Sequence, residues 1–418
     1  MANTHYSGLT TDPVPKVLLS LAIPSSVGLF FNTMYNVVDT FVAGYLSTQA
    51  LASLSISYPI FFALIALSMG VGSGATALIA NALGSNDIST AKRYAKQTIG
   101  FGILLGVMIS VLGILFVPYL LTLLGAKGEY LNTASNYLVT IFWGSIFITI
   151  IFMFNAILNA VGDTKSYRNV LIAGFFTNSL LSPMLAFGWF GLPVLGISGI
   201  AIATIATNAL GALYLWFKVR ETGLVIKESR GQYSPDMKTY LDIAGQGFPA
   251  SLSLMTISVG AFIITYFVST FGESTVAGYG VGMRIEQIVL IPGIGINIAV
   301  LTLIGQNNGA KRYDRVREII QVAMRYSLYI STFAAAFIFI CSGYVIDIFT
   351  DDIAVINSGV GYLSVAAPSH GTKTAPSDHS TAPSNGNNEY IPLPTNKNSK
   401  PVVGRKGKSG ITKTYTSY

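Results

Sequence analysis

The sequence predicts an all-α protein that crosses a membrane many times, and three observations support this fold class. Only 10% of the 418 residues are Asp, Glu, Lys or Arg, whereas an ordinary soluble domain has about 25%. Apolar runs recur that are long enough for a transmembrane helix, which needs about 20 residues. The first part of the chain also repeats in the second part at a fixed spacing. A soluble enzyme is therefore not expected.

Nine apolar runs are long enough to cross a bilayer, and a tenth, from Ile353 to Ala367, is a short stub. Several runs exceed the minimum, as expected for tilted helices or helices that extend beyond the lipid. The expected spans cover residues 16–43, 53–83, 94–124, 134–160, 167–189, 194–218, 239–270, 276–305 and 318–349.

Basic residues gather in alternate loops, after the second, fourth, sixth and eighth spans. The other loops contain a single basic residue, Lys127. Because cytoplasmic loops carry an excess of Lys and Arg, the N-terminus is expected in the cytoplasm and the chain in the plasma membrane. The net charge of +7 is explained by this topology, and nucleic-acid binding is not expected. The basic loop residues include Lys92, Arg93, Lys96, Lys165, Arg168, Lys218, Arg220, Lys227, Arg230, Lys311, Arg312, Arg315 and Arg317.

An internal repeat divides the chain into two lobes. Four pairs of like residues are each 225 positions apart: Pro24 and Pro249, Ala52 and Ala277, Gly84 and Gly309, Tyr137 and Tyr362. The repeated unit has six spans, so the second copy re-enters the membrane in the same orientation and the repeats are parallel. The expected parts are an N-terminal lobe (1–218), a cytoplasmic linker (219–238), a partial C-terminal lobe of three spans plus the stub (239–367), and a polar tail (368–418).

The tail is rich in Ser, Thr, Pro, Gly, Asn and Lys, so it cannot form a packed core and is expected to be disordered. It is either a natural regulatory tail or the product of an altered reading frame or a truncated gene. The second explanation is favoured because the composition changes inside an expected helix.

Asp39, near the outer end of the first span, is the main candidate for a functional residue. An acid within a bilayer is costly unless it faces a polar cavity or is neutralised. One interpretation is that Asp39 caps a helix at the outer interface. The other is a buried carboxylate that exchanges a proton or holds a cation, with polar partners on neighbouring helical faces at Asn32, Tyr35 and Asn36.

Further polar residues interrupt later spans of the same lobe. Asn178 and Ser182 share one helical face by their i, i+4 spacing, as do Thr204 and Asn208. Hydrogen bonds between helices explain any one of them, whereas together with Asp39 they predict a lined cavity. In the second lobe, Glu273, Arg284 and Glu286 are either interfacial residues or a charged cluster. The other polar positions are Asn155 and Asn159.

Several kinds of chemistry find no support. The single cysteine lies in an apolar run and the three histidines in polar terminal stretches, so no metal site is expected. The glycines at positions 70, 72 and 74 lack the preceding strand and following acid of a dinucleotide site. No catalytic motif is present, so the chain is predicted to be neither an enzyme nor dependent on a cofactor.

The chain resembles the multidrug and toxic compound extrusion (MATE) family over roughly residues 14–367. The resemblance is carried by "YNVVDTFVAG" around Asp39, "ALGSND" with its repeat "GQNNGAKR", "NAVGDTK", and "VAGYGVGMRIE". The sequence around Asp39 is most similar to that of the DinF-like branch. The resemblance implies a two-lobe fold of parallel six-helix repeats, of which this chain has nine spans and a stub, with the second lobe incomplete.

The resemblance also implies a function. Members are antiporters that export cationic or amphipathic organic compounds by alternating access, driven by proton or sodium entry. Asp39 matches the acid that binds the coupling ion, with Asn178, Ser182 and Thr204 beside it. Tyr35, Asn155 and Asp39 itself line the substrate cavity. Ser182 stands where many relatives have an acid, which favours protons over sodium as the coupling ion. The protein is expected to act as a monomer surrounded by lipid.

Three other functions remain open. A truncated chain could be a non-transporting membrane fragment or scaffold that pairs with a complete transporter. A flippase for lipid-linked precursors would need several basic residues facing its cavity to hold pyrophosphate, and the spans contain essentially only Arg284. A membrane enzyme has the weakest support, for want of a catalytic constellation.

Overall fold

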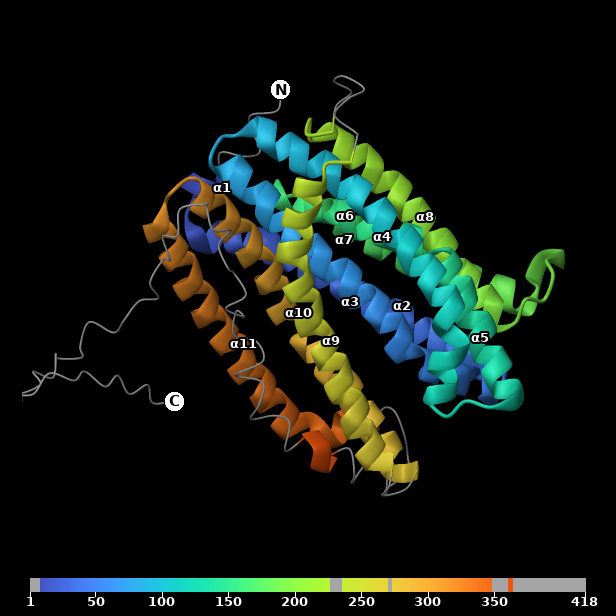
Figure 1. Cartoon of the computed structure of the whole chain (residues 1–418). Helices are drawn as coiled ribbons and strands as arrows, with labels where there is room; N and C mark the ends of the chain where they lie inside the picture. The colour runs from blue at the N-terminus through green and yellow to red at the C-terminus, as the bar shows by residue number, and fades with distance from the viewer. Residues whose placement is uncertain (1–7, 226–234, 270–272, 348–359, 364–418) are drawn as a thin grey trace, which may run out of the picture. The chain divides into compact units, whose positions relative to one another are not determined.

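The computed structural model describes residues 8–225, 235–269, 273–347 and 360–363, and every regular element within these ranges is helical (Figure 1). The described residues belong to one unit, residues 1–383. The predicted tail and most of the stub lie outside the described residues. The helices are α1 (Gly8–Thr11), α2 (Val14–Leu46), α3 (Thr48–Gly84), α4 (Ile88–Leu123), α5 (Gly128–Trp143), α6 (Ser145–Ala160), α7 (Lys165–Phe187), the short 3-10 helix η1 (Trp189–Gly191), α8 (Ile197–Glu221), α9 (Met237–Ser269), α10 (Glu273–Gly309) and α11 (Tyr313–Asp347).

Each of the nine predicted spans coincides with a long helix or, in one case, with a pair of helices. Within the described residues, six helices are long and apolar enough to cross a membrane, and the α5–α6 pair makes a seventh if it is one span. The six are α2, α3, α4, α7, α8 and the later part of α10. The division of the chain into lobes at residues 219–238 stays a prediction.

The structure differs from the prediction at residues 134–160, where two helices joined by a bend replace the single straight span. Helices α5 and α6 meet at Gly144 with an angle of 48° between them. A Cβ atom at Gly144 would overlap with the side chain of Ile205 in α8, so only glycine lets α8 pack into the bend. The hydrophobic run continues through this position, which is why the sequence pattern predicts one uninterrupted helix.

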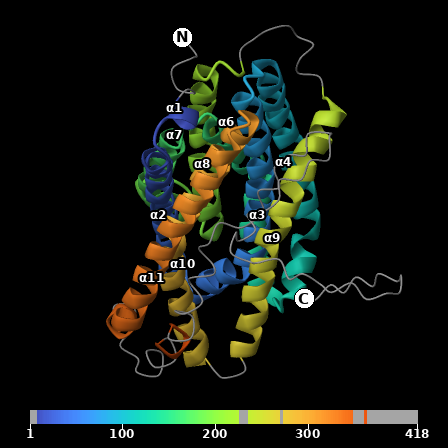
Figure 2. The same ribbon diagram turned by 90° about the vertical axis from the view of Figure 1, so that its left-hand side faces the viewer.

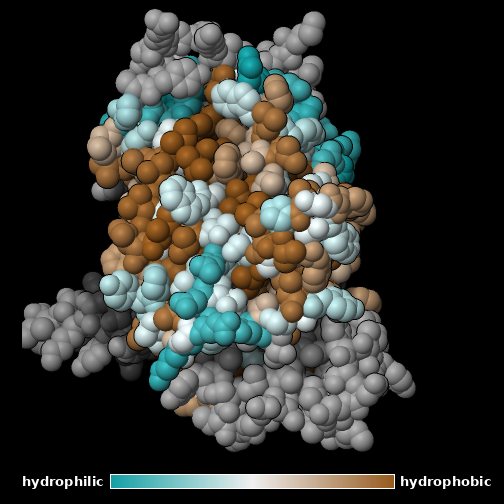
Figure 3. All heavy atoms as spheres, turned by 90° about the vertical axis from the view of Figure 1, so that its right-hand side faces the viewer, coloured by the Kyte–Doolittle hydropathy of each residue, from teal (hydrophilic) through white to brown (hydrophobic). Residues whose placement is uncertain are grey.

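Helix α4 shows the kind of surface that faces lipid. Its exposed large side chains are apolar along most of its length, among them Leu104, Val111, Leu115 and Phe116. Figure 3 shows a face of the molecule with hydrophobic residues across the middle and hydrophilic residues toward both ends. Exposed apolar surface of this extent is unfavourable in water and favourable in a bilayer.

The two repeats pack against each other through equivalent helices. Helices α2 and α3 belong to the first repeat, and α9 and α10 are their equivalents in the second. Helix α2 lies against α10, and α3 lies against α9 (Figures 1 and 2). A Cβ atom at Gly84 would overlap with the backbone of Gln306, and one at Gly309 with the backbone of Asn81. Asn81 and Gln306, like the two glycines, are 225 positions apart. The repeats are therefore related by a local two-fold arrangement.

The turns that follow α3 and α10 repeat the same backbone conformation. Asn86 has φ 61° and Lys311 has φ 57°, and these residues are again 225 positions apart. Left-handed conformations are uncommon outside glycine, especially for lysine. Their recurrence at equivalent positions supports duplication of one ancestral unit.

Candidate functional site

Asp39 lies inside helix α2, seven residues before its end, and only 5% of its surface is exposed. Its Oδ1 atom accepts hydrogen bonds from Asn178 Nδ2 at 2.6 Å and from Ser182 Oγ at 2.9 Å. Its Oδ2 atom accepts a longer hydrogen bond from Thr204 Oγ1 at 3.4 Å. The interpretation of Asp39 as an interfacial helix cap is therefore wrong.

The spacing of the polar residues explains how these donors converge. Asn178 and Ser182 are one turn apart on α7, so both amide and hydroxyl face α2. Helix α8 packs against α7 and also contacts α2, which brings Thr204 to the opposite side of the carboxylate. Asn178, Ser182 and Thr204 are all buried. The structure thus brings together the four residues predicted to bind the coupling ion.

Three buried polar atoms among the residues predicted for this site retain hydrogen-bonding capacity. The Tyr35 hydroxyl is buried beside Asp39 and Thr204. Asn178 Oδ1 and Asn155 Oδ1 are buried and accept no hydrogen bond from the described residues. A buried carbonyl oxygen without a donor is costly, and a bound cation, water or substrate would satisfy it.

The remaining predicted partners are used elsewhere. The Asn36 amide donates to the Asn32 carbonyl of its own helix and is exposed. The Asn208 amide likewise donates to the Thr204 carbonyl. Asn36, whose amide bonds within its own helix, and Asn32, which is exposed, therefore do not hold the carboxylate in this structure.

The charge of Asp39 has no cationic side chain to balance it among the residues that the structure describes. The ion pairs formed there join Lys16 to Asp12, Lys218 to Glu221 and Arg317 to Asp314. A buried carboxylate without a cationic partner needs hydrogen-bond donors, a proton or a bound cation. Within the same residues no group of three or more His, Cys, Asp or Glu could hold a metal ion.

An open apolar depression of about 600 Å³ on the surface lies beside the part of α2 that carries Asp39 and the end of α7. Val38 and Val42 of α2 and Pro183 of α7, which flank Asp39 and Ser182 in sequence, contribute to its wall. Tyr35 and Asn155, the residues predicted to line the substrate cavity, are not part of this wall. Its aromatic residues are Phe41, Tyr45, Phe187 and Trp189.

The predicted charged cluster of the second lobe falls on one helix. Glu273 begins α10, which also contains Arg284 and Glu286. Eleven residues of helix separate Glu273 from Arg284, which is about three turns and places them on one face. Their side chains lie outside the described set, so the cluster stays a prediction.

Comparison with known proteins identifies the family. A family model described as MatE matches residues 24–184 and 249–371. The chain belongs to the MatE family. The two matched segments begin 225 residues apart, which is the offset of the predicted repeat.

Related MatE proteins extend the comparison. The probable multidrug resistance protein YoeA of Bacillus subtilis (strain 168) is 29% identical over 311 residues, which cover 74% of this chain and 67% of that protein. The probable multidrug resistance protein NorM of Thermotoga maritima is 28% identical over 354 residues, which cover 83% of this chain and 75% of that protein.

A solved structure confirms the fold class of this MatE chain. The crystal structure of MATE in complex with MaD5 superposes with a TM-score of 0.81 and 25% sequence identity, covering 90% of this chain and 83% of that one. The all-α, MATE-type membrane fold predicted from the sequence is therefore correct.

One set of polar residues has contacts that the sequence pattern does not reveal. Thr302, Gln306 and Asn307 near the end of α10 are fully or almost fully buried. Gln306 and Asn307 belong to "GQNNGAKR", which marks the repeat and the family. In the sequence, the only sign of these contacts is that the side-chain amides of Gln306 and Asn307 lie next to each other at the end of an apolar helix. Their side chains donate to backbone carbonyls, and because every residue has a backbone carbonyl, the sequence does not show which ones are the partners.

Proposed function

We propose that this MatE chain is a secondary antiporter that exports cationic or amphipathic organic compounds. Entry of a coupling ion, a proton or sodium, drives the export by alternating access. The MatE match and the multidrug resistance proteins among its relatives support this proposal.

The observation that carries the proposal is the buried carboxylate of Asp39. Three side-chain donors from α7 and α8 surround it, and no cationic side chain does so within the described residues. Removing an unpaired charge from water is costly, so such a site favours a proton or a small cation. Asp39 is proposed to bind the coupling ion together with Asn178, Ser182 and Thr204.

The surroundings of Asp39 are suited to an organic compound. The adjacent apolar depression contains aromatic side chains that would contact a hydrophobic ring system. Tyr35 and Asn155 offer buried polar atoms that could orient a polar group. Binding of the compound and of the ion near one carboxylate would make them compete, which is the simplest form of antiport.

The first prediction concerns Asp39 in proteoliposomes that contain the 418-residue chain. Asp39→Asn keeps the size of the side chain but removes its charge. We expect ion-driven efflux of a fluorescent organic cation to fall by about tenfold or more, since typical coupling energies between sites correspond to factors of this size. Efflux is measured with an imposed proton gradient and, separately, with an imposed sodium gradient.

The matched control is Asp314→Asn, because the Asp314 side chain is fully exposed at the start of α11. It should leave efflux unchanged. Unchanged efflux in Asp39→Asn would contradict the assigned role of Asp39. Absence of ion-driven efflux in the unsubstituted chain would instead favour a non-transporting membrane protein.

A further inference from the structure

The close contacts between the two repeats run from the middle of α3 and α10 to one end of these helices. We call this the basic end; it comprises the turns at 85–87, 161–164 and 310–312 together with the helix ends that flank them. The charge pattern predicts that it faces the cytoplasm. Contacts so close that a Cβ atom would overlap join α2 to α10 and α3 to both α9 and α10. The glycines at these contacts are Gly70, Gly74, Gly84, Gly247, Gly295, Gly305 and Gly309.

At the basic end, α10 supplies hydrogen-bond donors to the end of α6 in the other repeat. Thr302 Oγ1 donates to the Asn159 carbonyl at 3.0 Å, and Gln306 Nε2 donates to the Ala160 carbonyl at 2.7 Å. Ala160 is the last residue of α6. The final carbonyls of a helix have no N–H of their own helix to accept from. The Asn159 carbonyl also accepts a hydrogen bond from the backbone N–H of Gly162 at 2.8 Å, so α10 adds a second donor there and supplies the donor to Ala160.

The next residue of α10 holds the N-terminal segment. Asn307 Nδ2 donates to the Leu9 carbonyl at 3.2 Å, and Asn307 Oδ1 accepts a hydrogen bond from Arg315 Nε at 3.1 Å. The same guanidinium donates through Nη2 to the Asp12 carbonyl at 2.8 Å. Residues 9–12 are thus fastened to α10 and α11, although they precede α2 of the first repeat.

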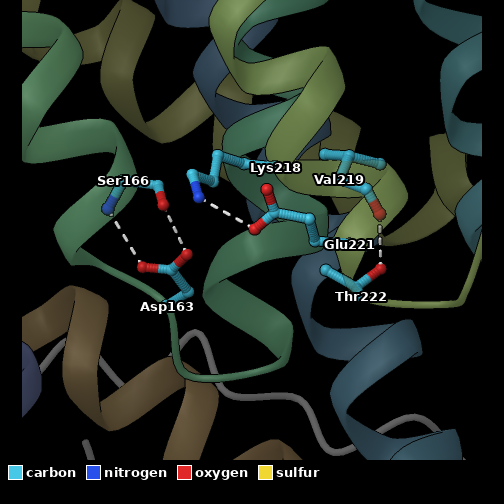
Figure 4. Close-up of polar contacts among 6 residues, drawn as sticks. All are labelled: Asp163, Ser166, Lys218, Val219, Glu221 and Thr222. Atoms are coloured by element: carbon cyan, nitrogen blue, oxygen red, sulfur yellow. Dashed lines mark hydrogen bonds and ion pairs between the residues drawn. The ribbon is translucent and has the colours of Figure 1, made fainter. Parts of the chain in front are cut away.

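The side chain of Leu9 connects this segment to the first repeat. Leu9 is buried, and a Cβ atom at Gly162 would lie 2.8 Å from its Cδ1 atom. Gly162 has φ 82° and lies in the turn between α6 and α7. Figure 4 shows how the next residue, Asp163, fixes this turn by accepting hydrogen bonds from the backbone N–H and the hydroxyl of Ser166. The surface that receives Leu9 is therefore well defined.

We propose that Thr302, Gln306, Asn307 and Arg315 form a lock that holds the basic end closed. Each of the first three donates a hydrogen bond to the backbone of the other repeat, or of the segment that precedes it. The bonds of Thr302 and Gln306 must break before α10 can move away from α6, and those of Asn307 and Arg315 must break before α10 and α11 can move away from residues 9–12. The inference rests on the proposed alternating access, because only a transporter that opens at both ends needs a releasable contact here.

The lock explains why buried donors are placed in an apolar interface. Purely hydrophobic contact would close the basic end but would not require one particular register of α10 against α6. Hydrogen bonds are directional, and leaving a buried donor without an acceptor is costly. The closed state is therefore well defined, while water can satisfy the same groups once the end opens.

The test measures opening of the basic end directly, without transport. Spin labels are attached to Glu221→Cys on α8 and Glu318→Cys on α11, both exposed, in a Cys341→Ser background. Thr302→Val and Gln306→Met remove the donors while keeping similar side-chain volumes. We expect each to raise the ratio of long to short label distances by about twofold to tenfold, the factor typical of one hydrogen bond.

Matched variants control for folding and for helix end effects. Asn307→Leu should open the basic end, whereas Asn308→Leu, one position along and outside the lock, should not. Thr302→Ser restores the hydroxyl and should restore the unsubstituted distances. Gel filtration and thermal unfolding show which variants are folded. The label distances in any folded variant that lacks a donor, Thr302→Val, Gln306→Met or Asn307→Leu, then show whether that donor holds the basic end closed.

Unsubstituted distances in folded Thr302→Val and Gln306→Met would overturn the lock. This outcome is separate from a failure of the proposed function. If the chain carries out no ion-driven efflux but the distances shift as expected, the lock stands and antiport does not.

Discussion

At the scale of single residues, the site is defined by one carboxylate and the kind of donor around it. Ser182 Oγ lies 2.9 Å from Asp39 Oδ1, at the position where the family resemblance leads us to expect an acid. A hydroxyl there contributes a donor without a second negative charge. The charge at the centre is therefore that of one carboxylate, which one proton neutralises.

Ser182→Asp tests this interpretation by adding the second acid. Two carboxylates in contact cannot both remain charged without a shared proton or a cation between them. We expect efflux by this variant to become dependent on sodium, with at least about a fivefold response to a sodium gradient. Efflux is measured in proteoliposomes with and without sodium, and Ser182→Ala, which lacks the added charge, serves as the control. No gain of sodium response would mean that the second acid does not determine the coupling ion.

At the scale of helices, most boundaries follow from local rules. The side chain of Ser47 accepts a hydrogen bond from the Ala50 N–H and begins α3, and the side chain of Asp87 accepts one from the Thr90 N–H and begins α4. Such caps satisfy N–H groups that lack partners at a helix start. The hydrogen bonds from Thr90 hold the pKa of the Asp87 carboxyl below its usual range.

The Asp87 cap predicts a pH dependence of stability. Because the pKa of Asp87 is lower in the folded protein than in the unfolded chain, its contribution is complete above the unfolded pKa, near 3.9. The contribution is lost as the pH falls through the folded pKa. Asp87→Ala should therefore lower the thermal unfolding midpoint at pH 7 and have a smaller effect at pH 3.

The measurement is thermal unfolding of the purified protein in detergent at both pH values. Asp87→Asn is the control, since an amide also caps a helix but does not titrate between pH 3 and pH 7. A difference between Asp87→Ala and the unsubstituted protein that grows at pH 3 would contradict this explanation.

At the scale of the whole molecule, the sequence predicts the fold and the Asp39 cluster because both depend on periodic patterns. Apolar runs reveal spans, and the i, i+4 spacing of Asn178 and Ser182 reveals a shared face. The bend at Gly144 was not predictable, since an apolar run continues through it. The contacts of Thr302 and Gln306 were not predictable either, because their partners are backbone carbonyls.

The two-fold relation between the repeats leads to the last prediction. Gly84 touches the backbone of Gln306 just as Gly309 touches the backbone of Asn81. A methyl group at either position forces the same two backbones apart, and overpacking of this kind costs about 1–3 kcal/mol. Gly84→Ala and Gly309→Ala should therefore lower the thermal unfolding midpoint by similar amounts.

Gly245→Ala provides the matched comparison, because a Cβ atom at this helical position meets nothing within 4 Å. Replacing a helical glycine by alanine in open space stabilises a protein by about 0.4–1 kcal/mol, so the midpoint should stay constant or rise. The three variants are compared by thermal unfolding in the same detergent. If only one of Gly84→Ala and Gly309→Ala were destabilised, the two contacts would not be equivalent. The stability of the closed basic end would then depend on one repeat more than on the other. The two repeats would be alike in sequence and backbone conformation but not in the free energy that their contacts contribute.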